Sequence, residues 1–182
     1  LDYDVTILSP RKYLLPPKEA LLSFEVAGES QTVQPGQPMV LLGVHPYDLV
    51  ATNQMDELFS QGEYDTHYMD RRKNITVIAC DVVTPSKNVF ASSMNTATAD
   101  KGFDILLTDI GDAYVVEAAT DKGEALVKTM NGAREATESD LNRRKAVQDK
   151  NRVNLNKHVL NCKPSYLPTL LEKAYDHPVW EE

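Results

Sequence analysis

The stretch Phe103-Asp-Ile-Leu-Leu-Thr-Asp-Ile-Gly-Asp-Ala-Tyr-Val-Val-Glu-Ala118 decides the fold class of this chain. It holds two short apolar runs, residues 103–108 and 113–118, which have the length and the β-branched content of strands. The link Ile110-Gly-Asp112 between them is short enough for a hairpin turn. The stretch therefore predicts an antiparallel pair of strands.

Two earlier runs extend this sheet. Residues 39–44 and 75–80 are continuously apolar, which is typical of strands that are buried on both faces. Helical spacing over 47–60 and a shorter helical pattern over 65–72 separate them, and residues 121–130 form a further expected helix. Strands that alternate with helices favour the α/β class, and the hairpin makes the sheet mixed. We therefore expect a single domain with a mixed β-sheet flanked by helices.

The remaining segments give weaker signals. Residues 3–8 have the pattern of a short strand, and residues 20–26 fit either a strand or a short helix. Residues 28–38 contain two glycines and two prolines, which predicts a loop. Residues 133–150 are highly charged with few large apolar side chains, so they predict a long and mostly exposed helix.

Composition narrows the classes of partner. The chain has 182 residues and a net charge of -8, which argues against nucleic acid because phosphate binding needs a concentrated basic face. The basic runs at 71–73 and 143–145 are interleaved with acids and predict solvated helix surface. No apolar run approaches the length of a membrane span. The two cysteines, Cys80 and Cys162, fit a reducing cytoplasm better than a disulfide scaffold.

No complete catalytic or metal-binding constellation is visible. His67, His158 and His177 are isolated from one another, and the glycines form no phosphate-binding loop. Three aspartates, Asp104, Asp109 and Asp112, surround the hairpin without the spacing of a calcium loop, so they are better interpreted as turn-stabilising residues. Whether the chain is part of an enzyme stays open on this basis.

The end of the chain, Pro168-Thr-Leu-Leu-Glu-Lys-Ala-Tyr-Asp-His-Pro-Val-Trp-Glu-Glu182, carries a resemblance to a known family. A helix is expected over 165–176, with Ser165 as a candidate cap. The segment resembles the one that leads into the cysteine-rich ferredoxin domain of the iron–sulfur electron-transfer proteins of sulfhydrogenases (their β subunits) and of anaerobic sulfite reductases. Four further stretches add to the resemblance: Leu8-Ser-Pro-Arg-Lys-Tyr-Leu-Leu-Pro-Pro17, Leu42-Gly-Val-His-Pro-Tyr-Asp-Leu49, Ile78-Ala-Cys-Asp-Val-Val-Thr-Pro85 and Phe90-Ala-Ser-Ser-Met94.

The chain departs from that family at four cysteine positions. These fall on Tyr47, Val82, Val89 and Ala91, none of which supplies the thiolate that an iron–sulfur cluster needs. Cys80 lies two residues before Val82 and so on the same strand face, but one thiolate holds no cluster, and a small buried hydrophobic role is the favoured interpretation.

The resemblance thus implies a vestigial cluster pocket. Its candidate residues are His45, Tyr47, Cys80, Val82, Val89, Ala91 and Ser93. The alternative is that His45 and the neighbouring serines simply cap turns and bind backbone.

The family implies a role in electron transfer. Residues 1–160 would form an α/β domain, and residues 161–182 would form a helix and linker toward a ferredoxin-type domain with 4Fe-4S clusters beyond Glu182. The chain itself would hold no cofactor. It would act as a scaffold or docking domain beside a catalytic subunit and a flavin-containing subunit of a hydrogenase or sulfite-reductase complex. The alternative is a stand-alone domain that has lost redox function and binds a small molecule or a protein.

Overall fold

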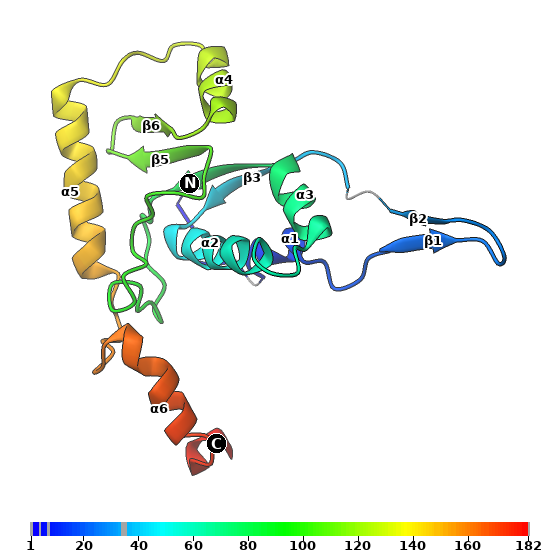
Figure 1. Ribbon diagram of the computed structural model, residues 1–182. Coiled ribbons are helices and arrows are strands. Elements are labelled where there is room, and N and C mark those ends of the chain that lie inside the picture. Colours follow the sequence, from blue (N-terminus) through cyan, green and yellow to red (C-terminus); the bar gives the residue numbers. More distant parts are fainter. Residues whose placement is uncertain (1, 4, 7, 34–35, 182) are drawn as a thin grey trace.

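A mixed four-stranded sheet forms the centre of the molecule (Figure 1). The computed structural model describes residues 2–3, 5–6, 8–33 and 36–181. The strands follow one another across the sheet in chain order: β3 (Met39–Val44), β4 (Ile75–Cys80), β5 (Ile105–Asp109) and β6 (Tyr114–Ala118). The pairs β3–β4 and β4–β5 are parallel, whereas β5–β6 is the antiparallel hairpin. The α/β class with a mixed sheet is confirmed.

Helices α1 (Arg11–Leu14), α2 (Pro46–Phe59) and α3 (Thr66–Asn74) supply the main core together with β3, β4 and β5. In α2, a proline occupies the first turn and Leu49 is buried on the inner side. Leu58 is 67% exposed, whereas Thr52 is buried on the inner side of the same helix. The main core comprises Leu14, Val44, Leu49, Tyr68, Ile75, Val77, Ala79, Ala99, Phe103 and Leu106.

A buried aspartate joins the sheet to helix α4 (Asp121–Thr129). One carboxylate oxygen of Asp104 accepts a hydrogen bond from the backbone N–H of Val77 at 2.8 Å, and the other accepts one from the Thr120 hydroxyl at 2.5 Å. Thr120 in turn caps α4 by accepting from the N–H of Gly123. A Cβ atom at Gly123 would lie 2.0 Å from the Asp104 carbonyl oxygen, so only glycine allows this close approach.

Helix α5 (Glu138–Asn154) runs beside β5 and β6. It begins five residues later than the sequence predicts, because Thr137 and Asp140 form a capping box that fixes the first turn. Most of its side chains are exposed, as expected, but Asp140 and Asn151 are buried.

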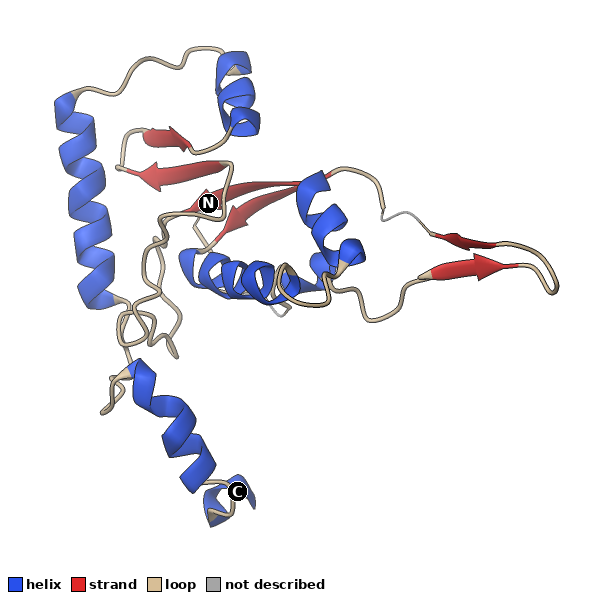
Figure 2. Cartoon of the chain, viewed as in Figure 1, coloured by secondary structure: helices blue, strands red, loops and turns tan. Residues whose placement is uncertain are grey.

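The final helical segment projects away from the rest of the chain (Figures 1 and 2). It consists of the 3-10 turn η1 (Pro164–Tyr166), helix α6 (Leu167–Lys173) and the 3-10 turn η2 (Pro178–Glu181). The expected Ser165 cap is wrong: Ser165 lies inside η1, and Tyr166 occupies the cap position of α6 without a side-chain hydrogen bond. Pro168 suits the start of α6, since a proline needs no N–H partner there.

Strands β1 (Leu22–Phe24) and β2 (Ser30–Thr32) form a separate antiparallel hairpin, shown in red away from the sheet in Figure 2. The strand interpretation of 20–26 therefore holds, whereas the loop expected over 28–38 contains β2. The strand expected over 3–8 falls partly on residues 4 and 7, which lie outside the described residues, and the described residues between them form no strand. Within the described part of the chain, no helix combines the length and the apolar character needed to cross a bilayer.

Candidate functional site

The candidate site lies where the parallel strands end. His45 directly follows β3, and the pair Asp81-Val82 directly follows β4. In open α/β sheets, the carboxyl ends of parallel strands are the usual place for ligands. The loop of residues 83–97 comes next in the chain and contributes the other side chains of the site.

The four positions to which the resemblance assigns cysteines lie in one apolar cluster. Val82 and Ala91 are 3% and 5% exposed, and Tyr47 and Val89 pack against them as half-buried neighbours. Ala97 and Leu155 complete this group, which we call the small cluster. The structure therefore brings together residues from the start of α2, the end of β4 and the following loop.

A hollow of about 410 Å³ opens beside the small cluster. Its lining is mainly apolar, with the polar side chains of Ser86, Asn88 and Thr96 among it. The apolar lining residues are Val5, Tyr47, Val89, Phe90, Ala91 and Met94. The volume is within the range of small-molecule pockets.

His45 is buried within a group of aromatic rings. Its ring stacks on Tyr3 with centroids 4.1 Å apart, and its Nδ1 is hydrogen-bonded to the Tyr47 hydroxyl. The Tyr3 hydroxyl donates to the carbonyl of Gly43. Burial, with smaller contributions from Cys80 and Asp48, raises the pKa of Tyr3 to about 12, so this phenol stays protonated at neutral pH. The arrangement holds the His45 ring by packing and by hydrogen bonding.

Cys80 is fully buried and does not belong to the small cluster. Its thiol donates to the Gly43 carbonyl across a 3.4 Å contact. Burial, followed by the charge of Asp81, raises the pKa of the thiol to about 11. A thiol that remains protonated is a poor nucleophile and a poor metal ligand, which agrees with the packing role expected from the sequence.

The serines of the loop bind the end of α5. The Ser93 hydroxyl donates to the side-chain oxygen of Asn156 at 2.7 Å and accepts from the N–H of Leu160 at 3.2 Å. The Ser92 hydroxyl donates to the Asn151 carbonyl at 3.1 Å. These contacts connect the loop to the segment that follows α5.

Polar residues that the sequence did not single out close the site from the α5 side. The Asn151 amide donates to the carbonyl of Val82 at 3.0 Å, and the Gln148 amide donates to the Asp81 carboxylate at 3.3 Å. The same carboxylate accepts from the Thr108 hydroxyl at 2.6 Å. The sequence offered no distinguishing signal for them, because most positions of α5 are polar.

The residues at this site do not fit an iron–sulfur cluster. Such clusters are held by about four cysteine thiolates, whereas the small cluster offers a phenol and aliphatic side chains at those positions. Among the described residues, no group of three or more His, Cys, Asp or Glu side chains is placed to hold a metal ion.

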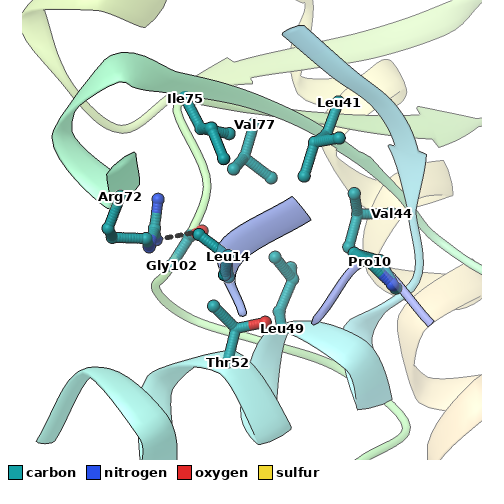
Figure 3. A pocket seen from close by; sticks show the side chains of 10 residues that line it. All are labelled: Pro10, Leu14, Leu41, Val44, Leu49, Thr52, Arg72, Ile75, Val77 and Gly102. Atoms are coloured by element: carbon teal, nitrogen blue, oxygen red, sulfur yellow. Dashed lines mark hydrogen bonds between the residues drawn. The ribbon is translucent and has the colours of Figure 1, made fainter. Parts of the chain in front are cut away.

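A second cavity lies inside the main core (Figure 3). Its walls include Leu14, Leu49 and Val77, and Arg72 donates to the Gly102 carbonyl at its rim. The volume of about 10 Å³ is at the lower limit for one water molecule. This cavity is a packing gap and too small for a ligand.

Comparison with known proteins gives one clear similarity. The chain is 30% identical over its whole length to the sulfhydrogenase 2 subunit beta of Pyrococcus furiosus. The aligned region covers 53% of that protein, so the chain spans about half the length of this curated relative. No family profile matches the chain, and neither does any solved structure.

Proposed function

Because this chain is homologous over its full length to part of a sulfhydrogenase β subunit, we propose that it is a scaffold and docking domain of an electron-transfer protein. The domain carries no cluster of its own. It positions iron–sulfur modules between the catalytic and the flavin-containing subunits of a cytoplasmic redox complex. The full-length similarity is the observation that carries this proposal.

The apolar side chains of the small cluster support the proposal that this domain holds no iron–sulfur centre. Tyr47 and three residues of the stretch 82–91, the positions to which the resemblance assigns cysteines, pack against one another. Apolar side chains at such a place remove the metal ligands and fill the space that the metal would occupy, so no thiolate is left buried without a metal partner. We therefore interpret the small cluster and the adjoining residues as a vestigial cluster pocket.

The arrangement of the C-terminal segment supports the proposed domain division. Backbone hydrogen bonds of η1, α6 and η2 are local, such as Tyr166 N–H to the Lys163 carbonyl and Ala174 N–H to the Leu170 carbonyl. Tyr175 and Trp180 are 82% and 61% exposed. In this proposal, residues 161–182 connect the α/β domain to a ferredoxin-type domain with 4Fe-4S clusters, against which these side chains pack.

Co-expression with the other subunits of the complex tests the proposed function. We expect the chain to co-purify in fixed stoichiometry with the catalytic and flavin-containing subunits, identified by mass spectrometry. A chain that co-purifies with neither of them under anaerobic conditions would contradict the proposal.

Iron content tests the vestigial pocket separately. The chain purified without oxygen should be colourless, whereas stoichiometric iron or a broad absorption band near roughly 400 nm would contradict it, since thiolate-bound clusters absorb there. The variant Tyr47→Cys/Val82→Cys/Val89→Cys/Ala91→Cys should take up iron on reconstitution. Replacing Cys162 with serine in that variant is the matched control and should leave the iron uptake unchanged.

The hollow beside the small cluster favours one other function, a small-molecule-binding domain. Its lining by Tyr47, Phe90 and Met94 suits an apolar or aromatic ligand. Ligand-observed NMR with a panel of small aromatic compounds tests this alternative. Binding that the filling variant Ala91→Leu abolishes would support it, and the absence of any binding at millimolar concentration would exclude it.

A further inference from the structure

The hairpin of β1 and β2 extends from the molecule as an arm, which we define as residues 20–33 (Figure 1). Every residue from Ala20 to Thr32 is exposed. The base of the arm is held: the carboxylate of Glu19 pairs with Arg71 of α3, and Arg71 also donates to the Leu14 carbonyl. The base is therefore fixed to the body, while the arm itself is surrounded by solvent.

The two faces of the arm differ in chemistry. Leu22 lies opposite Thr32 in the pairing, and Phe24 lies opposite Ser30, so these side chains share one face. Leu22 and Phe24 are 61% and 72% exposed, and Val26 in the turn is 96% exposed. The pair Ser23 and Gln31 occupies the other face. Within the paired residues, the face of Leu22 and Phe24 is therefore the apolar one and the face of Ser23 and Gln31 is the polar one, with Leu21 on the latter face nearer the base of the arm.

An arm of this kind is poorly stabilised by itself. Its ladder has only three residue pairs, and an isolated two-stranded hairpin is marginally stable in water. Apolar side chains stabilise a structure when they leave water, and the exposed face of the arm does not gain this stabilisation in this chain. A surface that covers Leu22 and Phe24 would supply this missing stabilisation.

Charge indicates the nature of that surface. The arm carries two acids, Glu25 and Glu29, and no Lys or Arg. A complementary surface is basic around an apolar floor. A second copy of this chain is a poor match, because its net charge is -8 and its clustered arginines are already paired with acids. These pairs are Arg71–Glu19, Arg72–Asp56, Arg143–Asp112 and Arg144–Glu117.

We infer that the arm docks into a groove of a different polypeptide with an apolar floor for Leu22 and Phe24 and a Lys/Arg rim for Glu25 and Glu29. This inference rests on the proposed function, since the partner is another component of the same redox complex. The arm is then the element that attaches the scaffold to that partner.

Binding to the separately purified subunits tests the inference. The catalytic subunit and the flavin-containing subunit are immobilised in turn, and the Kd of the full 182-residue chain is measured by surface plasmon resonance. We expect Leu22→Asp/Phe24→Asp to raise the Kd for one of the two by at least about tenfold, as for buried apolar anchors. Ser23→Asp/Gln31→Asp adds the same charge to the polar face and is the matched control, expected to change the Kd only slightly.

The thermal unfolding midpoint of all variants should equal that of the wild type, because the substituted residues lie outside the main core. If the wild type binds neither of the two proteins, the proposed function and the inference both fail. If the wild type binds and both double variants bind equally well, only the inference fails. A dimer of the chain alone that Leu22→Asp/Phe24→Asp dissociates would identify a second copy as the occupant and overturn the inference.

Discussion

The main core and the small cluster are both apolar, but they are closed in different ways. The main core is built mainly from strands and helices, whose backbone groups largely satisfy one another. The small cluster is built largely from the loop after β4, so its backbone needs partners from elsewhere. Helix α5 and the segment after it supply them: Asn151 binds the Val82 carbonyl, and the N–H of Lys157 binds the Val89 carbonyl at 2.7 Å.

This difference means that side chains of the small cluster can be exchanged with little effect on the sheet. Side chains of the small cluster do not support the sheet, since Leu106, Val77 and the other main-core residues form a separate group. A cysteine that binds an iron–sulfur centre at this place could therefore be replaced by Val or Ala without leaving a cavity in the main core.

The largest effect is expected for Leu106→Ala. Leu106 is 1% exposed at the centre of the main core, and such truncations cost about 2–5 kcal/mol in the free energy of unfolding. Val82→Ala removes fewer methyl groups from the small cluster and should cost clearly less. Urea unfolding measures both, with Leu22→Ala in the exposed arm as the control. Equal losses for Leu106→Ala and Val82→Ala would show that the two regions form one core.

The next effect concerns the closure of the small cluster. Asn151→Ala leaves the buried carbonyl of Val82 without its amide partner, which should cost about 1–3 kcal/mol. Asn154→Ala lies on the exposed side of the same helix and controls for the change in helix propensity. Hydrogen exchange should show faster opening of residues 83–97 in Asn151→Ala, with the strands of the sheet still protected. Faster hydrogen exchange throughout the chain, including the strands of the sheet, would contradict the prediction that residues 83–97 open independently of the sheet.

A smaller effect is expected at the start of α5. Thr137→Ala removes the hydroxyl that accepts from the Asp140 N–H at 3.3 Å, and losing such a cap costs about 1 kcal/mol. Ser139→Ala in the exposed first turn is the matched control. Thermal unfolding followed by circular dichroism measures the difference. A variant as stable as the control would mean that the capping box does not hold α5 in place.

The smallest effect is a pH dependence at the same cap. The hydrogen bond from Arg134, followed by those from the N–H and hydroxyl of Thr137, holds the pKa of the Asp140 carboxyl well below its usual range. A carboxyl with a lowered pKa in the folded state stabilises the protein above its unfolded pKa of about 3.9, and this contribution disappears as the pH falls through the folded pKa. The stability difference between wild type and Asp140→Asn should therefore narrow below about pH 4. Urea unfolding at several pH values measures this difference, and a gap that widens on acidification would refute the assignment.

The regular elements were accessible from sequence because their signals are local. The runs 39–44, 75–80 and 103–118 are apolar over the length of a strand, and the structure places strands there. Helix α5 was displaced by five residues at its start, because charged residues over 133–137 resemble a helix surface until the Thr137 cap is recognised. The β1–β2 hairpin was missed in part, since its strands are short and fully exposed.

The sequence by itself determined the class of the fold, the order of its strands along the chain and the absence of a thiol at Tyr47, Val82, Val89 and Ala91. Only the tertiary structure decided that these four residues lie together, that Cys80 points to the Gly43 carbonyl and that α5 closes the loop. The physical reason is the distance along the chain over which each kind of interaction acts. Strand and helix patterns arise from neighbours within a few residues, whereas contacts between a helix start, a strand end and a loop depend on how the whole chain packs.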